Sequence, residues 1–457
     1  MERRLVTLIL VNLASIMERA DEALLPAVYD QVGKAFGVSP SALGTLTFIR
    51  ALVQALASPL AAYLTLRHNR IMVIAGGAVA WAIATAAVGS CTAYWQAVIA
   101  KAFNGIGLAI VVPAIQSIVA DYHKDSERGL GFGFLHGAGQ FGTLIGGIFA
   151  TLMAGQVLGN LAGWRFAFYF VAFVSLLLGG AIYMFAQDVQ PPTLMVSVSE
   201  EPLINRDGSL KPANQHRQLQ ELWKGTRKVL KVRTFQVIVA QGLAGQIPWQ
   251  AISFATLWLE LMGFKRIDAA ISVGLLSVGN MLGSVFGGWV GDFSAQLSPN
   301  AGRILCAQFS ALIGIPLSGI LLLGLPQVSA PAWAYGFVLF LMGFLMSWNS
   351  PATNWPIFSE IVPTHLHTTV FAIDSMIEKS LAAAGAPLVG ILAERLFGYA
   401  SQKGTSGSDL DNANAIAKGL FSLMTIPFFL CFLVINLLYF TYPRDRDRVK
   451  KASPEVH

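Results

Sequence analysis

Four ionisable residues lie in the middle of the first hydrophobic stretch of the chain. The segment SIMERADEALLPAV, residues 15–28, contains Glu18, Arg19, Asp21 and Glu22. A charge at the centre of a membrane-spanning helix costs about 2.5–3.5 kcal/mol on insertion scales, so these residues need a function or a partner. At 100° per residue the three acids fall on one helix face, and this face is expected to line a water-filled cavity.

Two cations in later hydrophobic stretches lie at similar depths. Arg50 lies in the second stretch and Lys101 in the fourth. Because a helix rises 1.5 Å per residue, both side chains are expected to reach the layer of Glu18. We predict that Arg19, Lys101 and Arg50 bind an anionic substrate group, and that Glu18 takes up and releases a proton. The alternative is a set of salt bridges that only fasten helices, although desolvation makes buried pairs an inefficient source of stability.

A second acidic pair lies late in the chain, in the segment AIDSMIEKSLAAAG. Asp374 and Glu378 are four residues apart and share one helix face, with Lys379 to one side. A buried carboxylate can carry a proton through a transport cycle, so both acids are further candidates for proton coupling. His136 is interpreted as a hydrogen-bonded packing residue.

Aromatic and amide side chains gather near prolines in two stretches of the second half. Trp249 follows Pro248, and Asn349 precedes Pro351. Since broken helices often line transporter sites, we expect both residues to contact substrate. The alternative is that they belong to the aromatic belts at the membrane surfaces.

Four charged residues lie at or just beyond the ends of hydrophobic stretches, in corresponding places of the two halves. Asp121 ends the fourth stretch, and Glu360 lies near the end of the tenth. Arg70 lies in the connection between stretches two and three, and Asp292 lies in the corresponding connection of the second half. These positions indicate a weak similarity between the two halves.

The composition indicates a membrane protein. The 457 residues are 54% hydrophobic and 12% charged, whereas soluble chains carry about 25% charged residues. The net charge of +6 lies mostly in loops and the tail, so nucleic acid is not an expected partner. The three cysteines show no metal-ligand spacing, and nucleotide-binding and nucleophile-elbow motifs are absent. We therefore expect no cofactor, no metal site and no enzymatic activity.

Twelve apolar runs are long enough to cross a bilayer, which needs about 20 residues. None alternates with the period of two that a β-barrel requires, so we predict an all-α membrane protein with twelve transmembrane helices in two six-helix bundles. The runs lie near residues 5–29, 42–64, 71–90, 94–120, 129–154, 165–186, 234–260, 269–291, 303–324, 332–356, 366–396 and 418–442.

The distribution of lysine and arginine predicts the orientation. Connections on the side of both termini hold most of these residues, including eight between Arg206 and Arg233. By the positive-inside rule both termini are expected to be cytoplasmic. The chain is therefore predicted to be a multi-pass protein of the plasma membrane or an organelle membrane.

The polar gap after the sixth run divides the chain into four parts. They are an N-terminal six-helix bundle over 1–189, a cytoplasmic linker over 190–233, a C-terminal six-helix bundle over 234–443 and a basic cytoplasmic tail over 444–457. The linker contains a basic amphipathic pattern around Trp223, which predicts a helix on the cytoplasmic leaflet or a solvated helical linker.

Several segments resemble the major facilitator superfamily, and within it the Spinster-type lipid-transporter branch most closely. IMERADEALLPAVYDQV is similar to the pattern of the first span, and KAFNGIGLA to that of the fourth. DYHKDSERG and GWRFAFYFVAF resemble the connection after span four and the entry to span six. The resemblance implies that Glu18, Arg19 and Lys101 face a central cavity and act in substrate binding and proton coupling.

The chain departs from the family pattern at four positions. Lys101 stands where the family usually has Arg. In the connection between spans two and three, Leu66 replaces an Asp and Ala62 replaces a Gly, whereas the second copy keeps Gly288 and Asp292. The acid that Spinster proteins commonly carry after the Gly-x-Gly of span four is Leu108 here.

In the family, the connection between spans two and three belongs to an inner gate. The resemblance therefore implies gating roles for four residues of this chain, and Arg70 is expected to pair with Asp121. The four are Arg70, Asp121, Asp292 and Glu360.

These observations predict a secondary active transporter that works by alternating access. The two bundles would rock about a central site, with small-residue faces such as Gly142/Gly146 and Gly283/Gly287 allowing close helix contact. We expect a monomer that moves an amphipathic or anionic, lysolipid-like molecule together with protons, in contact with membrane lipids. The alternatives are a proton-coupled carrier of small organic anions or sugar phosphates, a membrane receptor that does not transport, and a purely structural membrane protein.

Overall fold

The computed structural model describes residues 2–38, 40–188, 215–252, 255–326, 331–380 and 409–452. Apart from one two-stranded hairpin, β1 (Val157–Leu158) with β2 (Leu161–Ala162), the regular structure of these residues is helical. The predicted all-α class therefore describes this part of the chain.

The helices of the first part, which we call the N-terminal half, cover the first six predicted spans. They are α1 (Glu2–Ala27), α2 (Tyr29–Phe36), α3 (Pro40–Ala57), α4 (Pro59–Thr65), α5 (Arg70–Ser90), α6 (Tyr94–Tyr122), α7 (Arg128–Ala154) and α8 (Gly163–Phe185).

The helices of the second part, which we call the C-terminal half, follow the amphipathic α10 (Gln215–Leu230). They are α11 (Arg233–Ala251), α12 (Ala255–Leu261), α13 (Arg266–Leu297), α14 (Gly302–Gly319), η2 (Ile320–Gly324), α15 (Ala332–Met346), η3 (Asn349–Asn354), α16 (Trp355–Glu360), η4 (Thr364–Leu366), a helix over 367–380, α18 (Asp409–Ile435) and α19 (Leu438–Ala452).

Among the described residues, eight helices are long and apolar enough to cross a membrane, or nine if the bent pair α3 and α4 forms one span. Helical segments lie at every predicted span, and the rest of the span over 366–396 beyond residue 380 lies outside the described residues. The charged α1 is not among the eight. The multi-pass membrane protein is confirmed, and the count of twelve spans stays a prediction.

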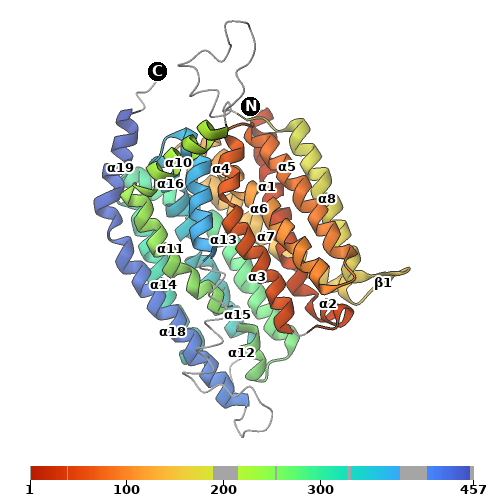
Figure 1. The fold of residues 1–457 in the computed structure, drawn as a ribbon. Coiled ribbons are helices and arrows are strands. Elements are labelled where there is room, and N and C mark those ends of the chain that lie inside the picture. The colour runs from red at the N-terminus through yellow and green to blue at the C-terminus, as the bar shows by residue number, and fades with distance from the viewer. Residues whose placement is uncertain are drawn as a thin grey trace, which may run out of the picture.

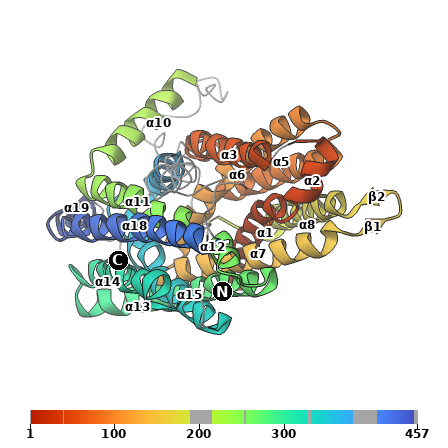
Figure 2. The same cartoon turned by 90° about the horizontal axis from the view of Figure 1, so that it is seen from below.

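The two halves lie side by side and both reach one common end of the molecule. Figure 1 shows α1 beginning and α19 ending at the top, which we call the terminal end. Seen from below in Figure 2, the N-terminal half lies on the right, the C-terminal half on the left, and α10 at the edge. The opposite end carries α2 and the start of α13.

Small residues bring the two halves into contact along α7 and α13. A Cβ on Gly129 would lie 2.5 Å from the carbonyl oxygen of Gly288, and a Cβ on Gly133 would lie 2.5 Å from that of Ser284. Because no side chain fits there, the backbones of the two helices approach each other closely near the terminal end. The contact between α7 and α13 closes the terminal end of the molecule.

Candidate functional site

A cavity of about 320 Å³ lies between the two halves near the middle of the helices. Residues from both halves line it, among them Arg19, His136, Gln140, Trp249, Asn349 and Glu378. A cavity between two helical bundles is a common place for the site of a membrane transporter.

Charged side chains of both halves meet in this cavity. Arg19 reaches it from α1, and Asp374, Glu378 and Lys379 reach it from the helix over 367–380. Glu378 accepts a hydrogen bond of 3.2 Å from the amide nitrogen of Gln246. The spacing of four residues that the sequence singled out thus places both acids on the cavity wall.

The ionisable residues of α1 form a connected chain that ends on α3. The Nε of Arg19 lies 3.3 Å from Glu18, and its Nη1 lies 2.8 Å from Glu22. Glu22 also pairs with Arg50, at 2.5 Å, and Arg50 donates to Gln54 on its own helix. Arg19 is therefore shared between two carboxylates, while Arg50 is buried outside the cavity lining.

Asp21 and Lys101 are buried inside the N-terminal half. Asp21 accepts hydrogen bonds from Thr85, at 2.5 Å, and from Asn104, at 3.0 Å. Lys101 is 1% exposed, and its Nζ lies 5.3 Å from the centroid of the Phe168 ring. The structure does not bring Lys101 to the cavity that Arg19 lines, so the predicted grouping of these two cations is absent from this conformation.

The break in the tenth predicted span contributes amide groups to the cavity. Between α15 and α16 the chain forms the wider helical turn η3, which contains Pro351. Asn349 donates to Gln241, at 3.0 Å, and Gln241 donates to Asn354, at 3.1 Å. Asn349 and Trp249, both predicted substrate contacts, line the cavity.

Several buried polar atoms on the cavity wall have no hydrogen-bond partner in the described part of the chain. They are Gln116 Oε1, His136 Nδ1, Asn280 Oδ1, Asn349 Oδ1 and Asp374 Oδ1. Since buried polar groups in proteins are nearly always hydrogen-bonded, these atoms are available to water or to a polar ligand.

Sequence reasoning missed part of this wall. Lys379 was noted only as a neighbour of the acids, and Gln116 and Asn280 were not singled out. Each is a polar residue within a long apolar helix, which is the signal that would have identified it.

At the terminal end, the N-terminal half contains a cluster of buried charges around Arg70. Arg70 pairs with Asp121, as predicted, and also with Asp188, at 2.5 Å, while donating to Ser117. His367 of the other half lies 2.6 Å from Asp121. The cluster therefore joins α5 and α6 to the C-terminal half.

A second cluster at the terminal end surrounds Arg303 of the C-terminal half. Arg303 pairs with Asp292, at 3.0 Å, and with Glu360, at 3.2 Å. Asp292 also accepts hydrogen bonds of 2.8 Å from the amide of Gly129 and 2.7 Å from that of Leu130. These amides begin α7, so the four predicted gating residues all lie in clusters at or beside the contact between the halves.

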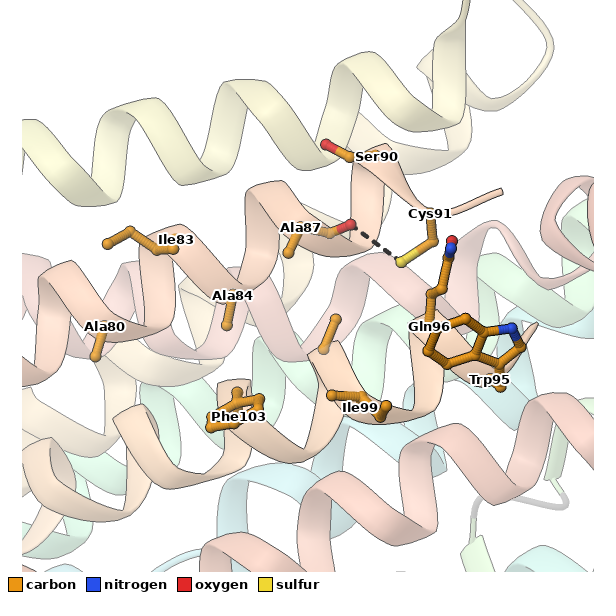
Figure 3. Close-up of a pocket in the computed structure, with 11 residues that line it drawn as sticks. Ala80, Ile83, Ala84, Ala87, Ser90, Cys91, Trp95, Gln96, Ile99 and Phe103 are labelled. Carbon is orange, nitrogen blue, oxygen red and sulfur yellow. Dashed lines mark hydrogen bonds between the residues drawn. The ribbon is translucent and has the colours of Figure 1, made fainter. Parts of the chain in front are cut away.

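A separate groove lies on the outside of the N-terminal half, between α5 and α6. It has a volume of about 630 Å³ and a mainly apolar lining. Figure 3 shows Ile83, Trp95, Ile99 and Phe103 along it, with the thiol of Cys91 donating to the carbonyl of Ala87. The exposed aromatic and aliphatic side chains fit a surface covered by lipid chains, and the groove shares no lining residue with the central cavity.

The described residues contain no group of three or more His, Cys, Asp or Glu side chains that could hold a metal ion. Among the charged groups of the central cavity, Arg19 forms ion pairs and Glu378 accepts a hydrogen bond from a neighbouring amide.

Comparison with known proteins gives a consistent assignment. The family model of the Major Facilitator Superfamily matches residues 11–387. Protein spinster homolog 1 of Xenopus laevis is 21% identical over 437 residues, which are 92% of this chain and 77% of that protein.

Solved structures share the fold. A bacterial homologue of the human lysosomal transporter Spinster, in an inward-facing and unoccupied conformation, matches with a TM-score of 0.61 and 17% identity over 97% of this chain and 98% of that chain. The human organic anion transporter MFSD10 matches with a TM-score of 0.66 and 14% identity over 94% of this chain and 99% of that chain. The chain is similar to Spinster homologues, and it belongs to the Major Facilitator Superfamily.

Proposed function

We propose that this protein is a proton-coupled secondary transporter that moves an anionic or amphipathic small molecule by alternating access. Its twelve spans form an N-terminal bundle over 1–189 and a C-terminal bundle over 234–443. The linker over 190–233 and the tail over 444–457 lie in the cytoplasm, and α10 rests on the cytoplasmic leaflet. The basic residues of the linker and tail support this orientation.

One observation carries this proposal: ionisable side chains of both halves line a single cavity between them. Arg19 comes from the N-terminal half, and Asp374, Glu378 and Lys379 come from the C-terminal half. A site divided in this way changes shape whenever the halves rock, so substrate affinity and conformation are linked.

Arg19 and Lys379 supply the positive charge for an anionic group of the substrate. Such a group could be a phosphate, which takes charge-assisted hydrogen bonds from guanidinium and ammonium groups. A lysolipid-like molecule carries this phosphate together with an acyl chain. A relative from Arabidopsis thaliana that is 28% identical over 116 residues is named a probable sphingolipid transporter, which supports a lipid-like substrate.

A small organic anion or sugar phosphate is the second candidate. The amides of Gln246, Asn280 and Asn349 give the cavity wall a polar character that suits a hydrophilic molecule. The resemblance in fold to an organic anion transporter is compatible with this candidate.

We infer proton coupling from the pairing of Arg19 with two carboxylates. Glu18 and Glu22 both pair with this guanidinium. A substrate anion that binds Arg19 competes with the two carboxylates, and a carboxylate that loses its cation in a buried site binds a proton more readily. Glu18 is the first candidate for this exchange, and Asp374 and Glu378 are the second. Substrate contact by Lys101 or Arg50 would require a conformation in which these side chains reach the cavity.

The first test is ligand binding followed by transport. A thermal-shift screen of purified protein against lysolipids, sugar phosphates and organic acids should identify a stabilising class, because a ligand that binds only the folded state raises its stability. That ligand is then used for uptake and counterflow in proteoliposomes.

In these vesicles, Glu18→Gln should abolish uptake driven by a proton gradient while counterflow exchange survives. Glu127→Gln, an exposed acid at the start of α7, serves as the matched control and should behave like the wild type. If Glu18→Gln leaves both activities unchanged, Glu18 is not the coupling group. If the wild-type protein shows neither binding nor uptake with any of the three classes, the proposed substrates are wrong.

A further inference from the structure

Each ring nitrogen of His367 lies close to an oxygen atom, and the contact of Nδ1 joins the two halves. Its Nδ1 lies 2.6 Å from Oδ1 of Asp121 on α6, and its Nε2 lies 3.0 Å from the backbone oxygen of Ser359 on α16. A carboxylate and a carbonyl are both acceptors, whereas a neutral imidazole carries only one N–H. The two contacts therefore cannot both be hydrogen bonds when the ring is neutral and Asp121 is ionised.

One additional proton resolves this conflict. On the ring it gives an imidazolium that donates to both oxygens. On the Asp121 carboxyl it lets the acid donate to Nδ1 while Nε2–H donates to Ser359. In either arrangement the contact between His367 and Asp121 contains one extra proton. The comparison is with a neutral imidazole and an ionised carboxylate.

Because both side chains are buried, the contact between His367 and Asp121 depends on this proton. The side chains of His367 and Asp121 are only 2% and 4% exposed, so water does not replace a lost hydrogen bond. Arg70 of α5 is the other cation that faces Asp121, and it is shared with Asp188, which follows α8.

Two further basic residues belong to the same region. His365 lies two positions away on η4, and Lys228 of α10 interacts electrostatically with it. The ion-pair partners of Asp121 among the described residues are Arg70 and His367. The extra proton therefore either makes His367 a second cation beside Asp121 or neutralises the Asp121 carboxyl.

We propose that His367 and Asp121 form a proton-binding site at the terminal end, and that binding a proton there closes this end of the transporter. The adjacent hydrogen bond of 3.0 Å from Thr368 to Ser117 joins the same two helices, so both contacts break when the helices separate. The site is distinct from Asp374 and Glu378, which line the central cavity, and from Glu18, which pairs with Arg19. The inference rests on the proposed function in one respect, because the terminal end must open during the cycle.

The direction of the pH effect follows from proton linkage. The closed end binds more protons than the open end, in which an imidazole in water titrates near neutral pH. A low pH therefore favours closure, and the closed fraction falls as the pH rises.

Spin labels across the terminal end measure this directly. Ser126 and Gln296 are exposed residues at this end of the N-terminal and C-terminal halves, and the three native cysteines are buried. The double variant Ser126→Cys and Gln296→Cys, labelled in nanodiscs, gives the distance distribution by pulsed electron paramagnetic resonance. Between about pH 5 and pH 8, the ratio of open to closed molecules should rise by up to about tenfold per pH unit for one linked proton.

Two variants test the assignment to this pair. His367→Gln should make the distribution independent of pH, whereas His365→Gln, an exposed histidine two residues away, should retain the wild-type profile. In Asp121→Asn the amide can donate to Nδ1 of a neutral ring, so the end should stay closed over the whole pH range.

The proposal is overturned if the wild-type distribution does not change with pH, or if His367→Gln keeps the wild-type pH profile. A failure of the proposed function gives a different result. In that case the distance distribution would still depend on pH through His367, but proteoliposomes would show no transport.

Discussion

The two halves carry matching arginine clusters at the terminal end. Arg70 is the first residue of α5, and Arg303 is the second residue of α14. Each pairs with an acid near the end of a later crossing of the same half, Asp121 for Arg70 and Glu360 for Arg303. The correspondence supports a repeated architecture in which both halves use a buried guanidinium to tie helix ends together.

The clusters differ in how they reach the opposite half. The Arg303 cluster uses the carboxylate of Asp292, which accepts from the amides that begin α7. In the N-terminal half the residue at the equivalent sequence position is Leu66, and the cluster reaches across through His367 instead. A carboxylate at a helix N-terminus is stabilised without a titratable donor, whereas the histidine contact depends on a proton. We therefore expect the contact through Asp292 to form without an additional proton and the contact through His367 to need one.

The largest effect is expected from Asp292→Ala. This change leaves Arg303 with one partner fewer and two amides of α7 without an acceptor. Since breaking a buried ion pair costs about 3–5 kcal/mol, the thermal unfolding temperature should fall and the spin-label distance at the terminal end should lengthen. Asp268→Ala on the same helix, an acid in the first turn of α13, is the control. If the spin-label distance of the closed state is unchanged in Asp292→Ala, this contact does not hold the terminal end closed.

A smaller effect is expected from Gly129→Ala. The new methyl group would meet the backbone of Gly288 and Asp292 Oδ1, at 2.5 and 2.8 Å, and overpacking of this kind costs about 1–3 kcal/mol. The open population of the labelled protein should increase at every pH. Gly147→Ala on the same helix is the matched control, because a Cβ there meets nothing within 4 Å. Equal behaviour of the two variants would show that α7 and α13 do not form the closing contact.

The smallest effect is expected from Arg448→Ala at the surface of the terminal end. Arg448 pairs with Asp445 at 3.6 Å, but the Arg448 side chain is 76% exposed. Exposed pairs contribute about 0–1 kcal/mol, so unfolding temperature and spin-label distances should remain near the wild type. An effect as large as that of Asp292→Ala would mean that the buried charges around Arg70 and Arg303 stabilise the protein no more than exposed charges do.

The sequence predicted the features that depend on local spacing. Long apolar runs gave the positions of the helices, and the spacing of Asp374 and Glu378 placed both acids on one face. Arg70 and Asp121 could be paired because both lie at the ends of neighbouring spans. These predictions need only the geometry of a single helix or of adjacent helices.

The remaining features depend on how helices pack, which spacing does not specify. Lys101 lies near the Phe168 ring and does not line the cavity. The close helix contact expected at Gly142 is present, and its partner, Ile16 of α1, belongs to the same half. The pairing of His367 with Asp121 joins residues 246 positions apart, and no local pattern indicates it.

Distances at both ends of the molecule test alternating access most directly. The terminal pair at Ser126 and Gln296 is compared with a second pair at the opposite end, Ala35 on α2 and Ala270 on α13, all four being exposed. Each pair is labelled through cysteine and measured across the pH range with and without the ligand found by the screen. The account predicts that molecules with a short distance at one end have a long distance at the other, so the two distributions shift in opposite directions. Distances that stay fixed at both ends, or that lengthen and shorten together, would contradict it.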